Sequence, residues 1–195
     1  MITNTRQLAI LQLLFFVFMI TMNALANGLP LNGYNTGEIS DMYPNLFVPA
    51  GFTFSIWGII YLLLLGYVAY STPILWKRDE TNLLSKAVIT TANYFILTCA
   101  LNGVWIMMWH MLLIELSLLL MLGFLVTLIV IYRKLQPHRI QLTGIQKLFL
   151  YVPFVVYLGW ISVATIANTT ALLVHYNWDG FGIDTASGIL DGSPS

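Results

Sequence analysis

Five long apolar runs alternate with short polar segments along this chain. The runs cover residues 8–26, 51–70, 87–109, 112–132 and 148–175. Each is close to, or above, the roughly 20 apolar residues that a helix needs to cross about 30 Å of hydrocarbon. The pattern therefore predicts an all-α membrane protein, with a five-transmembrane-helix bundle in residues 1–176 and a polar C-terminal tail in residues 177–195.

The third and fourth runs are separated by only a short polar interruption. From Tyr94 to Tyr132 the sequence is apolar almost throughout. A single helix of that length would be about 58 Å long, far more than a bilayer spans. His110 and Glu115 are the strongly polar residues near the middle. A tight turn between two antiparallel helices is therefore predicted there.

Three prolines suggest further boundaries. Pro49 suits the first turn of the second helix, where its missing N–H costs nothing. Pro73 is expected to end that helix, and Pro153 is expected to lie inside the fifth helix and kink it.

Basic residues favour one orientation across the membrane. All eight Lys and Arg precede the first run or lie between runs two and three or four and five, while residues 27–50, the link at His110 and the tail contain none. The positive-inside rule then predicts a cytoplasmic N-terminus and an external C-terminus. We expect membrane lipids as partners and no nucleic acid, because no basic patch exists outside these loops.

The first run also has features of a secretory signal, since Arg6 precedes it and Ala24-Leu25-Ala26 lies at its end. Its 19 residues exceed the usual signal core, which favours a retained helix. Cleavage would leave four crossings with the same orientation.

Polar and indole side chains within the runs are the candidates for function. Asn93, Asn102 and Asn168 lie in predicted spans, where an amide needs a partner on another helix or in a cavity. Trp57 and Trp160 lie deeper than an interfacial belt requires. Helix packing and ligand contact both remain open for these residues. The histidines show no metal-ligand spacing, so no metal site is predicted.

Three motifs follow one another in register. Residues 44–61 read PNLFVPAGFTFSIWGIIY and place Trp57 four residues before Tyr61, residues 101–105 read LNGVW, and residues 160–168 read WISVATIAN. Together they resemble the tryptophan-rich sensory protein family, also called the translocator protein or peripheral benzodiazepine receptor family (TspO/MBR). The resemblance covers roughly residues 8–177.

This resemblance implies a bundle that is commonly dimeric, with a pocket beneath the loop between helices one and two. The family binds porphyrins and other tetrapyrroles, sterols in some members, and synthetic benzodiazepine-type ligands. Carried over by motif, the ligand-binding residues would be Trp57, Tyr61, Asn102, Trp105, Trp160, Ala164 and Asn168.

Some family features are absent. Leu46 and Val48 stand where the family has Trp and the first of two prolines, and residues 27–43 lack the loop tryptophan of members credited with light-driven porphyrin breakdown. No Lys or Arg follows Tyr157, so the sterol-recognition pattern is missing. We therefore expect reversible binding without catalysis, although the enzyme question stays open through porphyrin chemistry.

Two function classes remain at this point. The first is an integral membrane binding or sensing protein for a planar hydrophobic ligand such as a porphyrin, in a bacterial inner (cytoplasmic) membrane. The alternative is a ligand-free structural or accessory subunit of a membrane complex. No cofactor is required in either case. A tetrapyrrole or a lipid is the candidate bound molecule, and a homodimer or larger complex is the candidate assembly.

Overall fold

The computed structural model describes residues 4–29, 31–44, 55–77 and 83–178. Pro49, expected in the first turn of the second membrane helix, lies outside these residues. The elements are α1 (Thr5–Gly28), η1 (Leu31–Gly33), α2 (Thr36–Asp41), α3 (Ile56–Lys77), α4 (Leu83–His110), α5 (Ile114–Leu135), η3 (Gln136–His138), α6 (Gly144–Leu150) and α7 (Val152–His175).

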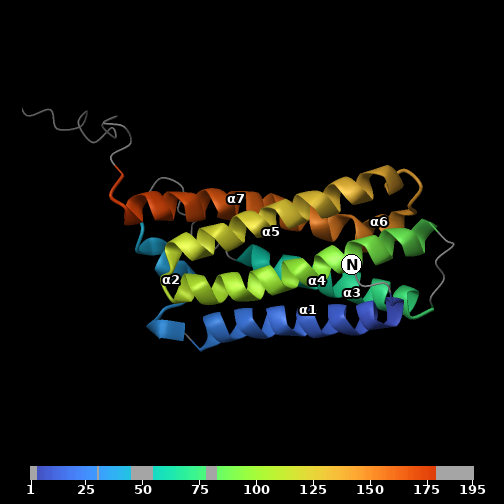
Figure 1. The fold of residues 1–195 in the computed structure, drawn as a ribbon, viewed down its shortest axis with the longest axis horizontal. Helices are drawn as coiled ribbons and strands as arrows, with labels where there is room; N and C mark the ends of the chain where they lie inside the picture. The colour runs from blue at the N-terminus through green and yellow to red at the C-terminus, as the bar shows by residue number, and fades with distance from the viewer. Residues whose placement is uncertain (1–3, 30, 45–54, 78–82, 179–195) are drawn as a thin grey trace, which may run out of the picture.

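Five long helices pack side by side along the long axis of the molecule (Figure 1). Helix α1 contacts α4 and α3, α4 contacts α5, α5 contacts α7, and α7 contacts α3. These contacts close the five helices into a ring around one apolar core.

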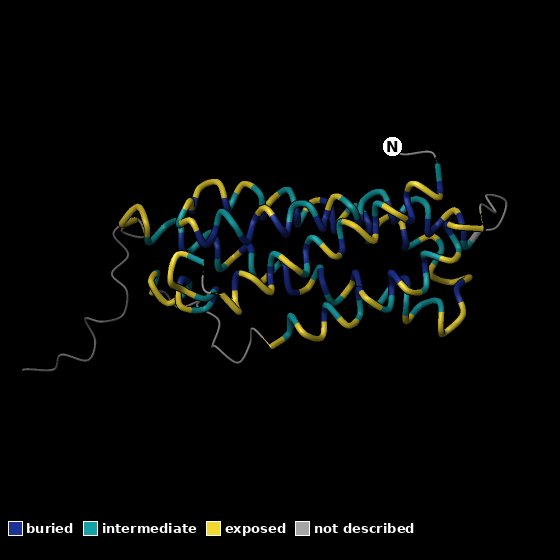
Figure 2. The backbone as a smooth tube through the Cα atoms, turned by 90° about the horizontal axis from the view of Figure 1, so that it is seen from below, coloured by how far each residue is buried: buried dark blue, intermediate teal, exposed yellow. Residues whose placement is uncertain are grey.

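Buried positions face the inside of the bundle and exposed positions face outward (Figure 2). Many exposed side chains are large and apolar, among them Leu14, Leu62, Leu119 and Val126. An apolar exterior is expected when hydrocarbon rather than water surrounds the helices. Five stretches of the described chain are long and apolar enough to span a membrane. The prediction of an all-α integral membrane protein with five such helices is confirmed.

The predicted turn between the third and fourth membrane helices is also confirmed. Helix α4 ends at His110 and α5 begins at Ile114. Leu112 adopts a left-handed conformation with φ 58°, and the Leu113 N–H donates to the Met108 carbonyl at 3.0 Å. The reversal is therefore as tight as the length of the apolar run required.

The prediction that Pro73 ends the second membrane helix is wrong, because α3 continues to Lys77. Transmembrane helices tolerate proline where neighbouring groups support the turn. Here the Gln12 side-chain amide on α1 donates to the hydroxyls of Ser71 at 2.9 Å and Thr72 at 2.8 Å. This turn of α3 is thus held by a neighbouring helix.

The expectation that Pro153 kinks the fifth membrane helix from inside is likewise wrong. The predicted span 148–175 consists of two helices, α6 and α7, that meet at Tyr151. Pro153 lies in the first turn of α7, where its missing N–H removes no intrahelical hydrogen bond. The break between α6 and α7 therefore lies just before the proline, and no kink forms inside a continuous helix.

The two ends of the bundle differ in charge. The described Lys and Arg residues lie at the starts of α1 and α4, at the ends of α3 and α5, and in the η3–α6 segment. These elements meet at one end, whereas η1, α2 and the end of α7 lie at the other (Figure 1). We refer to the second end as the loop end.

Candidate functional site

Four aromatic side chains surround Trp57 in the first turn of α3. Its ring centroid lies 6.3 Å from that of Trp105 in a stacked arrangement and 5.9 Å from that of Trp160 at nearly right angles. Tyr61 and Tyr157 lie 5.6 Å and 6.4 Å away. The structure thus brings three of the predicted tryptophans, from α3, α4 and α7, into one cluster.

A cavity of about 610 Å³ lies beside this cluster at the loop end. We call it the loop cavity. Its walls come from the last turns of α1, from α2, and from α3 and α4. Trp57 and Tyr61 form the aromatic part of the wall, with Gly58 and Ile106 beside them. Two of the seven predicted ligand-binding residues therefore border the loop cavity.

Polar residues outnumber apolar ones among the remaining residues that line the cavity. Six polar residues that the motif comparison did not single out line it: Asn23, Asn27, Asn35, Thr36, Glu38 and Asp41. The sequence contains one usable signal for them, since Asn35 and Glu38 form a capping box at the start of α2. That pattern marks a helix start next to the cavity but does not by itself indicate a ligand.

A second, much smaller cavity of about 40 Å³ also borders Trp57. Its lining includes the other four predicted residues that face a cavity: Trp105, Trp160, Ala164 and Asn168. This volume is far below the roughly 300–1,000 Å³ of typical small-molecule sites, so the second cavity is too small for a planar ring system. The indole N–H of Trp105 is buried and has no hydrogen-bond partner among the described residues.

Asn102 lines neither cavity and is fully buried. Its side-chain oxygen accepts a hydrogen bond from Asn23 on α1, and its amide donates to the Tyr157 hydroxyl on α7 at 3.0 Å. Asn168 makes a similar link, because it exchanges hydrogen bonds with Ser117 on α5 at 3.1–3.2 Å. Both amides join helices in the core of the bundle.

The segment that covers the loop cavity is fastened to the end of α4 through His110. The His110 ring is buried, with Nδ1 3.3 Å from the Leu31 carbonyl and Nε2 3.1 Å from the Thr36 hydroxyl. Because a carbonyl only accepts, Nδ1 carries the proton and Nε2 of the neutral ring accepts from Thr36. Trp109 adds a hydrogen bond from its indole N–H to the Thr36 carbonyl at 3.3 Å.

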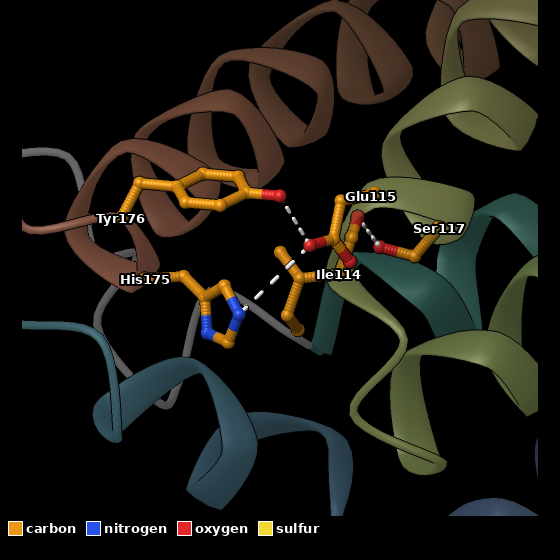
Figure 3. Close-up of polar contacts among 5 residues, drawn as sticks. All are labelled: Ile114, Glu115, Ser117, His175 and Tyr176. Carbon is orange, nitrogen blue, oxygen red and sulfur yellow. Dashed lines mark hydrogen bonds and ion pairs between the residues drawn. The ribbon is translucent and has the colours of Figure 1, made fainter.

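A separate polar cluster joins the start of α5 to the end of α7 at the same end (Figure 3). The Tyr176 hydroxyl donates to Glu115 Oε1 at 2.7 Å, and His175 Nε2 lies 3.9 Å from the same oxygen. The hydrogen bond to Glu115 and its negative charge raise the pKa of Tyr176. Burial, and to a lesser extent the Glu115 charge, raises the pKa of Tyr43.

This cluster does not resemble a metal centre. The residues that the structure describes contain no group of three or more His, Cys, Asp or Glu side chains able to hold a metal ion. His110 is used to hold the loop, and His175 faces Glu115.

The comparison with protein families agrees with this architecture. A family model described as TSPO-like protein matches residues 9–188. The chain belongs to the TSPO-like family. The resemblance drawn from the three sequence motifs is thus confirmed. No match is found among curated proteins or solved structures. For this TSPO-like chain, family membership supports an integral membrane protein and leaves the identity of its ligand to be argued from the site.

Proposed function

We propose that this protein binds a planar hydrophobic ligand, of the tetrapyrrole class, in the loop cavity. The observation that carries the proposal is the cavity itself: about 610 Å³ beneath the segment that joins the first two membrane helices, with Trp57 and Tyr61 in its wall. Small-molecule sites typically enclose about 300–1,000 Å³ and combine apolar or aromatic walls with a few polar groups.

The chemistry of the wall supports this class of ligand. An indole and a phenol offer flat, polarisable faces to an aromatic macrocycle. Asn23 can offer its side-chain oxygen as an acceptor, since its amide N–H groups already donate to Met19 and Asn102. Asn27 and Asn35 add further amide groups that can orient a polar substituent. These groups supply recognition, and we propose binding or sensing without catalysis.

The charge distribution supports an orientation in which the loop end is external. The described Lys and Arg residues lie at the opposite end, which the positive-inside rule assigns to the cytoplasm. The N-terminus is then cytoplasmic and the loop cavity opens toward the outer side of a bacterial cytoplasmic membrane. In a Cys99→Ser background, Gln141→Cys and Ser195→Cys should label from opposite sides, and labelling from one side would reject the orientation.

A ligand-free accessory subunit is the second candidate, and a specific observation favours it. Trp57 packs against Trp105, Tyr157 and Trp160, and Asn102 is fully engaged between helices. The same side chains would be needed for packing if no ligand ever bound. A homodimer or larger assembly fits either candidate.

Tryptophan fluorescence separates the two candidates. Titration of the purified protein in a neutral detergent with protoporphyrin IX should give saturable quenching. Trp57→Ala should raise the dissociation constant at least about fivefold, the equivalent of an aromatic contact worth about 1 kcal/mol. Trp76→Phe is the matched control, because Trp76 lies at the basic end and lines neither cavity. Quenching that never saturates would favour the accessory role.

The same complex tests the absence of catalysis. Illumination should leave the absorption band of the bound porphyrin as stable as that of free porphyrin, since the family's loop tryptophan is missing from residues 27–43. A protein-dependent decay that Trp57→Phe or Trp160→Phe abolishes would establish an enzyme instead.

A further inference from the structure

The mouth of the loop cavity carries negative charge. Glu38 and Asp41 both line the cavity, and both lie on α2 with exposed side chains. The Glu38 carboxylate also accepts the Asn35 backbone N–H at 2.7 Å, which fixes its place on the first turn of α2. Two carboxylates therefore stand at the polar side of a cavity whose other side is aromatic.

No described cation offsets them. The cavity walls from α1, α3 and α4 are uncharged. His110 on α4 is buried between Leu31 and Thr36, and His175 on α7 faces Glu115. The sequence has no Lys or Arg at residues 7–76, 87–132 or 148–195, and residues 45–54 contain no charged side chain at all.

We propose that the loop cavity selects planar ligands whose polar end is neutral or cationic and disfavours ligands that present carboxylates, such as free porphyrin propionates. This inference rests on the proposed function and narrows its ligand class. An anionic substituent held among the amides near α2 would meet Glu38 and Asp41 without a compensating cation. An ammonium at the same place would be attracted by both.

The size of the effect follows from Coulomb's law. Two unit charges about 4 Å apart in a water-like medium interact by an amount equivalent to roughly a fivefold change in affinity. Because the mouth is exposed, added salt should reduce the effect, the Debye length being about 10 Å at 0.1 M and about 3 Å at 1 M.

Three probes with one ring system test the proposal: protoporphyrin IX, its dimethyl ester, and its bis-amide with ethylenediamine. Their side arms carry negative, no and positive charge. We expect affinity for the protein in a neutral detergent to rise in that order, by about fivefold or more between the first and last. Each probe partitions differently into micelles, so the decisive quantity is the change in each dissociation constant between wild type and variants.

The variants remove charge with little change of shape. Glu38→Gln keeps an acceptor for the Asn35 N–H, because glutamine also serves in a capping box. Combined with Asp41→Asn, it should tighten the diacid, weaken the diammonium probe and leave the diester within about twofold. Glu115→Gln is the matched control, since Glu115 is an acidic residue at the same end that does not line the cavity.

The outcomes separate this inference from the proposed function. Saturable binding of all three probes, with constants that the double variant leaves unchanged, would overturn the charge selection and leave the binding function standing. Failure of every probe to bind would overturn the binding function itself. Equal effects of the Glu115→Gln control and the double variant would assign the selectivity to the net charge of the loop end rather than to the cavity, and would also overturn the inference.

Discussion

Replacement of Asn102 by leucine distinguishes a structural amide from a ligand contact. The sequence motifs predict that Asn102 binds the ligand, whereas the structure places it between α1, α4 and α7 with both side-chain groups engaged. Leucine has a similar volume, so the variant removes hydrogen bonds without opening a large cavity. Its effect on stability therefore reports chiefly the lost polar contacts.

The expected cost follows from the partners. The variant loses two interhelical hydrogen bonds, from Asn23 and to Tyr157. Such bonds in membrane proteins average about 0.6 kcal/mol and reach about 1.7 kcal/mol, which gives a loss of about 1.2 kcal/mol with an upper limit near 3.4 kcal/mol. Both partners keep a second contact, since Asn23 also donates to the Met19 carbonyl at 2.8 Å and Tyr157 lies 3.8 Å from the Met19 sulfur. A value toward the lower figure is therefore expected.

The assay is reversible unfolding in mixed micelles with increasing dodecyl sulfate, followed by circular dichroism. A double-mutant cycle with Asn23→Leu should give a coupling energy of about 0.6–1.7 kcal/mol. The control cycle pairs Asn102→Leu with Asn168→Leu, which shares no hydrogen-bond partner with it and should be additive within about 0.5 kcal/mol. Unchanged stability together with lost porphyrin affinity would refute the structural role and identify Asn102 as a ligand contact.

Two further predictions concern the packing of α1 on α4 and the cluster at the loop end. Gly103→Ala should destabilise the bundle, because the added Cβ would overlap the Phe18 ring on α1. Gly123→Ala is the control, since the nearest neighbouring atom would be 3.9 Å from its new Cβ. Dodecyl sulfate unfolding compares the two variants, and equal losses of stability would count against close α1–α4 packing. The pKa of Tyr176 is raised above its ordinary value of 10.0. Its hydroxyl should therefore keep its proton and its hydrogen bond to Glu115 below about pH 10, and lose both as the pH rises through the raised pKa. Carbon-13 NMR of the tyrosine Cζ should show Glu115→Gln lowering this pKa, and an unchanged titration would reject the contact.

The number and type of helices could be predicted because length leaves little choice. A run of 39 apolar residues cannot cross a bilayer once, so a turn at His110 was required by geometry alone. The two proline predictions are wrong because they rest only on the local rule that proline breaks or kinks a helix and leave out the neighbouring helices. At Pro73 the neighbouring Gln12 supports the turn, and at Pro153 the break comes two residues earlier, at Tyr151.

The site was predictable in part. The Trp57 and Tyr61 spacing placed both on one face of a helix, and both border the loop cavity. The sequence does not predict that Glu38 and Asp41 line the cavity, because the path of the loop between α1 and α3 places them there and no periodic pattern in the sequence indicates that path. The hydrogen-bond partners of Asn102 could not be predicted from the sequence either, because helical periodicity shows which face of a helix a residue lies on but not which helix packs against that face.

Packing and binding need not compete for Trp57. Trp105 and Trp160 hold its ring at 6.3 Å and 5.9 Å, and the same residue forms part of the wall of the loop cavity. An aromatic side chain that is already immobilised loses little conformational freedom when a ligand stacks on it, so a larger share of the stacking energy remains as affinity. The contacts that favour an accessory role therefore also preorganise a binding surface. The titration with protoporphyrin IX therefore distinguishes the two roles, because only the binding role requires a ligand to fill the space of about 610 Å³ that an indole, a phenol and polar side chains line.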